Sequence, residues 1–89
     1  MTVIERAAQA MHASAQPEWD WSDTDCAPLR KIYLDAARAM IASLRDPDEH
    51  MQKAGAEVIR YIDRAESDLA HEDDAANIWR LMIDAALEE

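Results

Sequence analysis

The sequence predicts an all-α protein, a compact bundle of four to five short helices in a single domain over residues 1–89. Helix-forming Ala, Leu, Glu and Arg are frequent, whereas the chain contains one Gly and three Pro. Apolar residues recur at helical spacing, and no stretch shows the alternation of a half-buried strand. The hydrophobic content of 49% is sufficient for a core, although a chain of this size buries only about 60–65% of its unfolded surface.

The first helix is expected to begin at Thr2 and to end before Pro17. The segment Thr2-Val3-Ile4-Glu5 has the spacing of a capping box, in which side chains at both ends satisfy exposed backbone N–H groups. Proline disfavours helical geometry in the residue before it, which predicts the end at Gln16. The expected apolar face consists of Ile4, Ala7, Ala8, Met11 and Ala15.

The second helix is preceded by an ordered connection over residues 17–25, and Asp25 is expected to cap it. This helix has the clearest apolar stripe in the chain. The stripe consists of Leu29, Ile32, Tyr33, Ala36, Ala37, Met40, Ile41 and Leu44. On the polar side, Lys31 and Asp35 have the i,i+4 spacing of a helical ion pair.

The segment Arg45-Asp46-Pro47 predicts a stop and a restart, because Asp46 suits an N-cap and Pro47 suits the first helical position. A short helix over 47–54 is expected to follow. Gly55 either ends it or lies within a longer helix, at a cost of about 1 kcal/mol relative to Ala. A fourth amphipathic segment is expected from Ala56 to about residue 70.

The acidic run 71–74 is expected to separate this segment from a final helix over 75–87, with Asp73 or Asp74 as its N-cap. The final helix is apolar around most of its circumference, and Trp79 is expected in the core. Such a helix is either central in the fold or covered by a second molecule.

Negative charge is concentrated near the end of the chain. The net charge is −10, and residues 63–89 hold nine acidic and two basic side chains, a net charge of −7. This asymmetry concerns partners and solubility rather than fold. Either it serves solubility alone, or a carboxylate ridge contacts a basic protein surface. The residues of the expected ridge are Asp63, Glu66, Asp68, Glu72, Asp73 and Asp74.

Trp19 and Trp21 are two residues apart, so they cannot share one helical face. One is expected to close an end of the bundle while the other is partly covered. The alternative is that one anchors a partner, since Trp is favoured at the energetic centres of interfaces.

No motif predicts catalysis, so the chain is expected not to be an enzyme, with no catalytic residue, cofactor or metal site. The single cysteine, Cys26, excludes an intrachain disulfide and is expected to be buried. His71 is expected to face solvent. The acidic loop around Asp20, Asp23 and Asp25 lacks the spacing of a calcium loop, and its carboxylates are expected to act in caps and turns.

Direct nucleic-acid binding is not expected, because the basic residues form no patch. No apolar run approaches the roughly 20 residues of a membrane span, and no secretory signal is present. The chain is therefore expected to be soluble, cytoplasmic and not membrane-bound.

Part of the chain, residues 35–87, resembles small proteins encoded by bacteriophages and prophages. The resemblance rests on Ala37-Arg38-Ala39-Met40, Leu44-Arg45-Asp46-Pro47, Met51, Ala54-Gly55 and the ending Ile78-Trp79-Arg80-Leu81-Met82-Ile83-Asp84-Ala85-Ala86-Leu87. It implies expression inside a bacterial host. Small acidic phage proteins include inhibitors of CRISPR surveillance complexes and other defence nucleases, which this chain is similar to in size and charge.

The leading hypothesis is an anti-CRISPR-like inhibitor that mimics nucleic acid. Its acidic ridge, with a loop Trp, would contact the basic nucleic-acid-binding surface of a host complex. The alternative is a phage structural or regulatory adaptor. That adaptor would form a homodimer, or dock on a protein partner, through the apolar face of the last helix.

Overall fold

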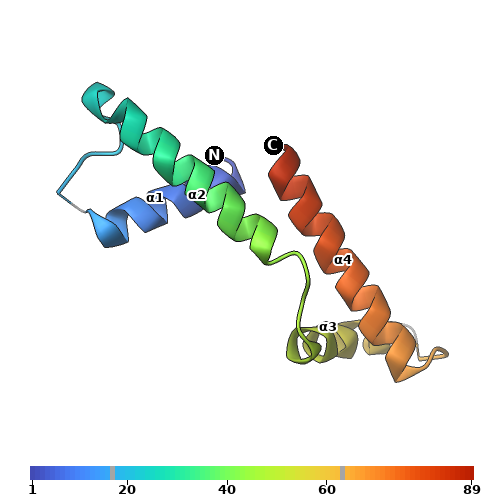
Figure 1. The fold of residues 1–89 in the computed structure, drawn as a ribbon. Coiled ribbons are helices and arrows are strands. Elements are labelled where there is room, and N and C mark those ends of the chain that lie inside the picture. The colour runs from blue at the N-terminus through green and yellow to red at the C-terminus, as the bar shows by residue number, and fades with distance from the viewer. Residues whose placement is uncertain (17, 63) are drawn as a thin grey trace. The chain divides into compact units, whose positions relative to one another are not determined.

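The computed structural model describes residues 1–16, 18–62 and 64–89. Within these ranges it contains four α-helices, one short 3₁₀ turn and no strand, which confirms the all-α prediction (Figure 1). The elements are α1 (Val3–Ala15), the 3₁₀ turn η1 (Thr24–Cys26), α2 (Ala27–Ser43), α3 (Glu49–Ile62) and α4 (Asp68–Glu88).

The chain divides into two compact units. Unit 1 comprises Met1–Ser43 with Ala86–Glu89, and unit 2 comprises Leu44–Ala85. The single domain over residues 1–89 stays a prediction.

Unit 1 is built on the packing of α1 against α2. The predicted N-cap of α1 is confirmed, because the Thr2 hydroxyl accepts a hydrogen bond from the Glu5 backbone N–H at 3.1 Å. The predicted Lys31–Asp35 ion pair on α2 is also present, at 2.7 Å. Local sequence signals therefore identify both helices of this unit.

The core of unit 1 is narrower than the sequence stripes indicate. Its buried residues are Ile4, Ala8, His12, Cys26, Ala37 and Ile41. Fully buried Ala8 and Ala37 have small side chains, which allow two helices to approach closely. Ala15, Ile32 and Met40, predicted on the apolar faces, are exposed. A helical stripe indicates which face is apolar, but the partner helix covers only part of it.

The connection between α1 and α2 differs from the prediction at its cap. Asp23, rather than Asp25, caps the chain there, because its carboxylate accepts from the Asp25 backbone N–H at 3.0 Å and opens η1. Cys26 is buried, as predicted. This burial, with the negative charge of Asp23, raises the pKa of the Cys26 thiol.

Unit 2 is a hairpin of α3 and the part of α4 that precedes Ala86. The predicted cap at Asp46 is wrong, since the Asp48 carboxylate accepts from the Met51 backbone N–H at 2.8 Å and α3 begins at Glu49. Gly55 lies inside α3, so the predicted helix over 47–54 continues into the segment predicted after it. The predicted end of that segment near residue 70 is wrong, because α3 ends at Ile62 and α4 begins at Asp68.

The start of α4 also corrects a prediction. The helix begins at Asp68, and the Ser67 hydroxyl accepts from the Ala70 backbone N–H at 3.2 Å. Asp73 and Asp74 are therefore inside a helix of 21 residues and do not cap it. The acidic run does not end the helix: Asp73 and Asp74 are exposed, and negative charge is favourable near a helix N-terminus.

Candidate functional site

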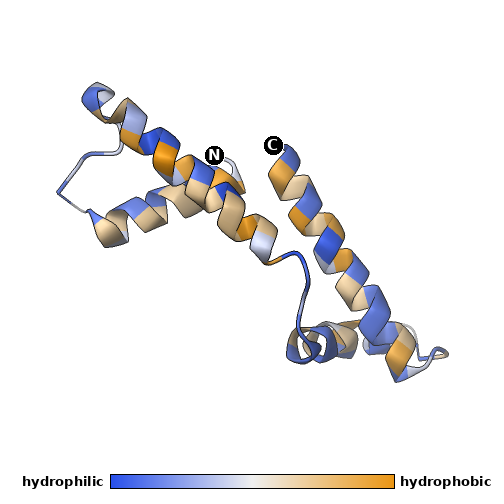
Figure 2. Ribbon diagram, in the orientation of Figure 1, coloured by the Kyte–Doolittle hydropathy of each residue, from blue (hydrophilic) through white to orange (hydrophobic). Residues whose placement is uncertain are grey.

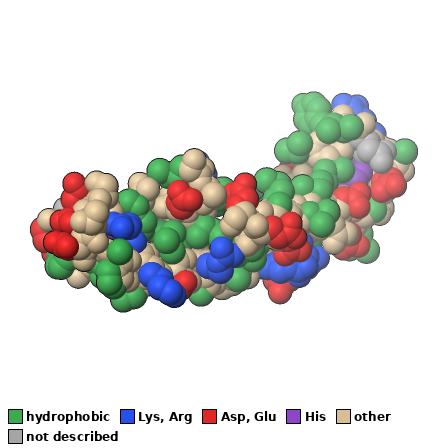
Figure 3. All heavy atoms as spheres, turned by 90° about the horizontal axis from the view of Figure 1, so that it is seen from above, with side chains coloured by type: hydrophobic (Ala, Val, Ile, Leu, Met, Phe, Trp, Pro, Cys, Tyr) green, Lys and Arg blue, Asp and Glu red, His purple; other side chains and the backbone are tan. Residues whose placement is uncertain are grey.

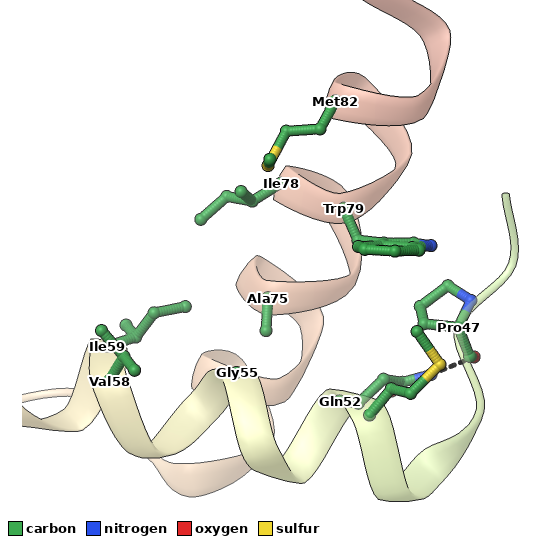
Figure 4. A pocket seen from close by; sticks show the side chains of 10 residues that line it. Pro47, Gln52, Gly55, Val58, Ile59, Ala75, Ile78, Trp79 and Met82 are labelled. Carbon is green, nitrogen blue, oxygen red and sulfur yellow. Dashed lines mark hydrogen bonds between the residues drawn. The ribbon is translucent and has the colours of Figure 1, made fainter. Parts of the chain in front are cut away.

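The most distinct surface feature of unit 2 is an apolar groove between α3 and α4 (Figure 4). Its volume is about 290 Å³. The residues that line it are apolar apart from Gln52; they are Pro47, Met51, Gln52, Gly55, Val58, Ile59, Ala75, Ile78, Trp79 and Met82.

The groove originates in the contact between Gly55 and Ala75. A Cβ atom added at Gly55 would lie 2.8 Å from the Ala75 Cβ, which is closer than such atoms approach in proteins. The two helix backbones meet at this point because neither residue has a large side chain. Larger residues stand on both sides of the contact, and Figure 4 shows Val58 and Ile59 on α3 and Ile78 and Met82 on α4 bordering the same space.

The groove walls remain accessible to solvent. Val58 is 65% exposed, Ile78 is 51% exposed and Met82 is 62% exposed. Ile78 and Met82 are one helical turn apart, so they form a continuous ridge along α4. Hydrophobic residues are interspersed with hydrophilic ones along α4 (Figure 2). The exposed apolar side chains that border the groove are typical of an interaction site.

The segment before α3 is held along α4 by polar contacts. The Trp79 indole N–H donates to the Leu44 carbonyl at 2.6 Å. The Arg45 guanidinium donates twice to the Asp84 carboxylate, at 2.9 and 3.2 Å. Trp79, predicted in the core, is half-buried and lines the groove, with its polar end satisfied by the backbone.

The Arg45–Asp84 pair has an electrostatic consequence. The hydrogen bonds from Arg45 lower the pKa of the Asp84 carboxyl from its ordinary value of 3.8. Both side chains are accessible to solvent, so screening limits the contribution of the pair to stability. Arg80 makes a parallel contact with Asp46 at 3.2 Å. These contacts fix the end of the groove at which Pro47 and Trp79 lie.

The residues of the predicted carboxylate ridge differ in solvent exposure and in whether they form ion pairs. Asp63 lies outside the described residues. Asp68 forms an ion pair with Arg60 at 3.1 Å. Glu72 is half-buried, and its charge adds to the effect of Glu49 in raising the pKa of Lys53.

Three residues of the ridge are exposed and form no ion pair in the described part of the chain: Glu66, Asp73 and Asp74. Glu66 lies in the turn between α3 and α4 rather than on a helix. Acidic and hydrophobic side chains share the visible surface in Figure 3. The ridge stays a prediction, with these three carboxylates as its unpaired members.

Trp19 and Trp21 both belong to unit 1. Trp19 is exposed, whereas Trp21 is half-buried with its ring centroid 5.6 Å from that of His12. Trp21 thus covers the unit 1 core, and Trp19 has the accessibility that an anchor residue requires. The role of Trp19 in binding stays a prediction.

Two histidines are buried, contrary to the expectation for His71. His71 is 1% exposed, and both of its ring nitrogens are buried without a hydrogen-bond partner among the described residues. His12 lies between the rings of Trp21 and Tyr33, with a centroid distance of 5.5 Å to Tyr33. Helical spacing is compatible with both burials, since His12 follows Ile4 and Ala8 at i,i+4 steps and His71 shares a face with Ala75 and Ile78 once α4 begins at Asp68.

The loop carboxylates act as predicted in turns. The Asp20 carboxylate accepts hydrogen bonds from the Ser22 backbone N–H and hydroxyl, which lower its pKa. Across the described residues, no three His, Cys, Asp or Glu side chains are grouped so that they could hold a metal ion. No helix in these ranges combines the length and hydrophobicity needed to cross a membrane.

The sequence predicts the part of the α3 wall that contains Val58 and Ile59 as an amphipathic segment, but not its continuity with Met51 across Gly55. Its signal is present, since Met51, Gly55, Val58 and Ile62 recur at the helical spacing of one face. Division of the segment at Gly55 concealed this pattern. Comparison with protein-family models, with curated proteins and with solved structures found no match.

Proposed function

We propose that this chain is a non-enzymatic protein-binding module that docks on a partner protein through the groove between α3 and α4. The observation that carries the proposal is the exposure of large apolar side chains on both groove walls, Val58 on one side and Ile78 and Met82 on the other. Burying one such side chain fully contributes about 1.5–3 kcal/mol. These three side chains are 51–65% exposed in the free protein, so a partner that covers the groove gains about half of this contribution from each.

A pair of matched variants tests the proposal. Ile78→Asp places a charge in the groove, whereas Leu81→Asp places the same charge on the same helix outside the groove lining. Both residues are more than half exposed in the free protein, so both variants should keep the helical content measured by circular dichroism. Each variant and the original chain serve as bait in host lysate, and bound proteins are quantified by mass spectrometry.

The expected result is a protein that the original chain and Leu81→Asp retain equally and that Ile78→Asp loses. If every retained protein binds equally to Ile78→Asp, the groove is not the docking site and the proposal is wrong.

A second candidate function is inhibition of a host defence nuclease or CRISPR complex by nucleic-acid mimicry. It is favoured by the exposed, unpaired carboxylates of Glu66, Asp73 and Asp74, and by the resemblance to phage and prophage proteins. Reversal of Asp73 and Asp74 to Lys should then abolish capture, and binding should weaken markedly with ionic strength. Capture that survives this reversal and high salt but is lost in Ile78→Asp supports the apolar groove instead.

A further inference from the structure

The dimensions of the groove indicate the kind of molecule that it accommodates. A protein cavity of about 150 Å³ holds one benzene molecule, so about 290 Å³ corresponds to roughly two side chains of that size. Small-molecule sites usually have about 300–1,000 Å³ and several polar groups that orient the ligand. This groove lies at the lower end of that range. Its polar lining residue Gln52 already donates a hydrogen bond to the Pro47 carbonyl at 3.2 Å, which leaves few polar groups to orient a ligand. The groove is therefore better suited to two apolar side chains of a bound peptide than to a small-molecule ligand.

The groove walls are two helical ridges, which is the geometry that receives a third helix. Met51 and Val58 lie two turns apart on α3, and Ile78 and Met82 lie one turn apart on α4. An amphipathic helix inserts residues of one face between such ridges. Two apolar residues spaced i,i+4 on that helix would fill the volume available.

The charge around the groove indicates which kind of amphipathic helix would bind there. None of the described residues that line the groove is charged. The sequence around it is acidic, since residues 44–85 hold 11 acidic and five basic side chains, a net charge of −6. Four of the five bases are already in ion pairs: Arg45 with Asp84, Lys53 with Glu49, Arg60 with Glu57 and Asp68, and Arg80 with Asp46. Exposed Asp74 precedes Ile78 by one helical turn, which places a carboxylate beside the α4 wall.

From these observations we infer that the groove binds a basic amphipathic helix of another protein, with two apolar residues at i,i+4 and Lys or Arg on the flanking positions. This inference rests on the proposed function and names its partner class. A second copy of the chain is disfavoured as the occupant, because it would bring a second unit of net charge −6 against the first. A basic helix is attracted by the same charge, and its binding should be rapid at low salt.

Two synthetic peptides test the inference directly. Each has about 18 residues, long enough for five helical turns, with Leu on one face at i, i+4 spacing. One peptide carries Lys on its remaining face, and the other carries Glu at the same positions. Binding is followed by fluorescence anisotropy of labelled peptide and by the amide resonance of Gly55, which is the single glycine of the chain and lines the groove.

The Lys peptide should bind and shift the Gly55 resonance, and the Glu peptide should bind at least tenfold more weakly. Ile78→Asp should weaken binding of the Lys peptide at least tenfold, whereas Leu81→Asp should change it less than twofold. Both variants add one negative charge, so non-specific attraction would strengthen in both. A loss confined to Ile78→Asp therefore reports apolar contact in the groove.

Equal binding of the two peptides, or binding of the Lys peptide that Ile78→Asp does not weaken, would overturn the inference. A dimer mass in light scattering that Ile78→Asp abolishes would also overturn it, in favour of a second copy as the occupant. If neither peptide binds while a lysate protein is still lost in Ile78→Asp, the partner class is wrong and the docking function stands. If that lysate protein is not lost either, the proposed function fails as well.

Discussion

In unit 1 the paired helices α1 and α2 bury two isoleucines between them, whereas in unit 2 the pair α3 and α4 borders an open apolar groove. Ile4 and Ile41 are buried in unit 1, and the rings of Trp21 and Tyr33 flank His12 there. In unit 2 the contact between helices is made at Gly55 and Ala75, and the larger residues beside it border an open groove.

The difference shows that an apolar helical face does not by itself indicate a core. Small residues stand at the helix contacts of both units, Ala8 and Ala37 in unit 1 and Gly55 and Ala75 in unit 2. The large side chains beside each contact therefore decide how much apolar surface is covered and how much remains accessible.

Unit 1 covers Ile4 and Ile41 but leaves Ile32 and Met40 exposed. Unit 2 leaves Val58, Ile78 and Met82 exposed beside a groove, which is the physical basis for the proposed docking function.

The largest expected effect compares a buried isoleucine of unit 1 with an exposed isoleucine of unit 2. Ile41→Ala should lower the free energy of unfolding by about 2–5 kcal/mol, because Ile41 is 5% exposed and its removal leaves a cavity. Ile78→Ala should lower it by less than about 1 kcal/mol, as is usual for surface positions. Urea denaturation followed by circular dichroism measures both. Equal decreases in the free energy of unfolding would mean that Ile78 belongs to a core, and the two units would then not differ in the burial of their isoleucines.

The next effect concerns the origin of the groove. Gly55→Ala adds a methyl group where Ala75 leaves no room, at a cost of about 1–3 kcal/mol that exceeds the gain of about 1 kcal/mol in helix propensity. We expect a net loss of stability in urea denaturation.

The double variant Gly55→Ala with Ala75→Gly provides the control, since it moves the methyl group from one helix to the other. The double variant should show positive coupling between the two sites. A stabilised Gly55→Ala protein would show that the helices are not held together at this point.

A smaller effect distinguishes the two candidate caps of α3. Asp48→Ala should cost about 1 kcal/mol, because the Asp48 carboxylate satisfies the Met51 backbone N–H. Asp46→Ala should cost less, since it removes only a solvent-exposed contact with Arg80. Thermal denaturation of the two variants compares them. A larger loss for Asp46→Ala would place the start of α3 at the position predicted from sequence.

The smallest effect is a pH dependence in unit 2. The pKa of Asp84 is lowered in the folded protein from its ordinary value of 3.8. Its contact with Arg45 therefore stabilises the fold fully at pH values above that ordinary pKa, and this stabilisation disappears as the pH falls through the lower pKa of the folded state. Between about pH 7 and pH 3, Asp84→Asn should therefore lose less stability than the original chain. Urea midpoints across this range measure the difference. Parallel profiles would show that the pair does not contribute.

Several features could be predicted from sequence because they depend on neighbours within one or two helical turns. The Thr2 cap, the Lys31–Asp35 pair, the turn roles of Asp20 and Asp23 and the all-α class are of this kind. Burial of Cys26 also followed from the ordinary preference of that residue.

The candidate site could be predicted only in part. The apolar face of the last helix is visible as a pattern, but the continuity of its partner wall on α3 is not, because Gly55 is compatible with either a helix end or a helix interior. The end of α3 at Ile62 and the start of α4 at Asp68 were likewise missed, since Ser67 is one of several residues there that could cap a helix.

The sequence alone determined the helical class, the polar and apolar faces and the negative charge, all of which follow from composition and local spacing. Tertiary structure shows that Gly55 lies inside a helix, at a point where Ala75 of α4 approaches too closely for a Cβ atom. It also decided that His71 is buried while Ile78 and Met82 are exposed. Those outcomes depend on which residues meet at a helix crossing, and that contact joins positions 20 residues apart along the chain.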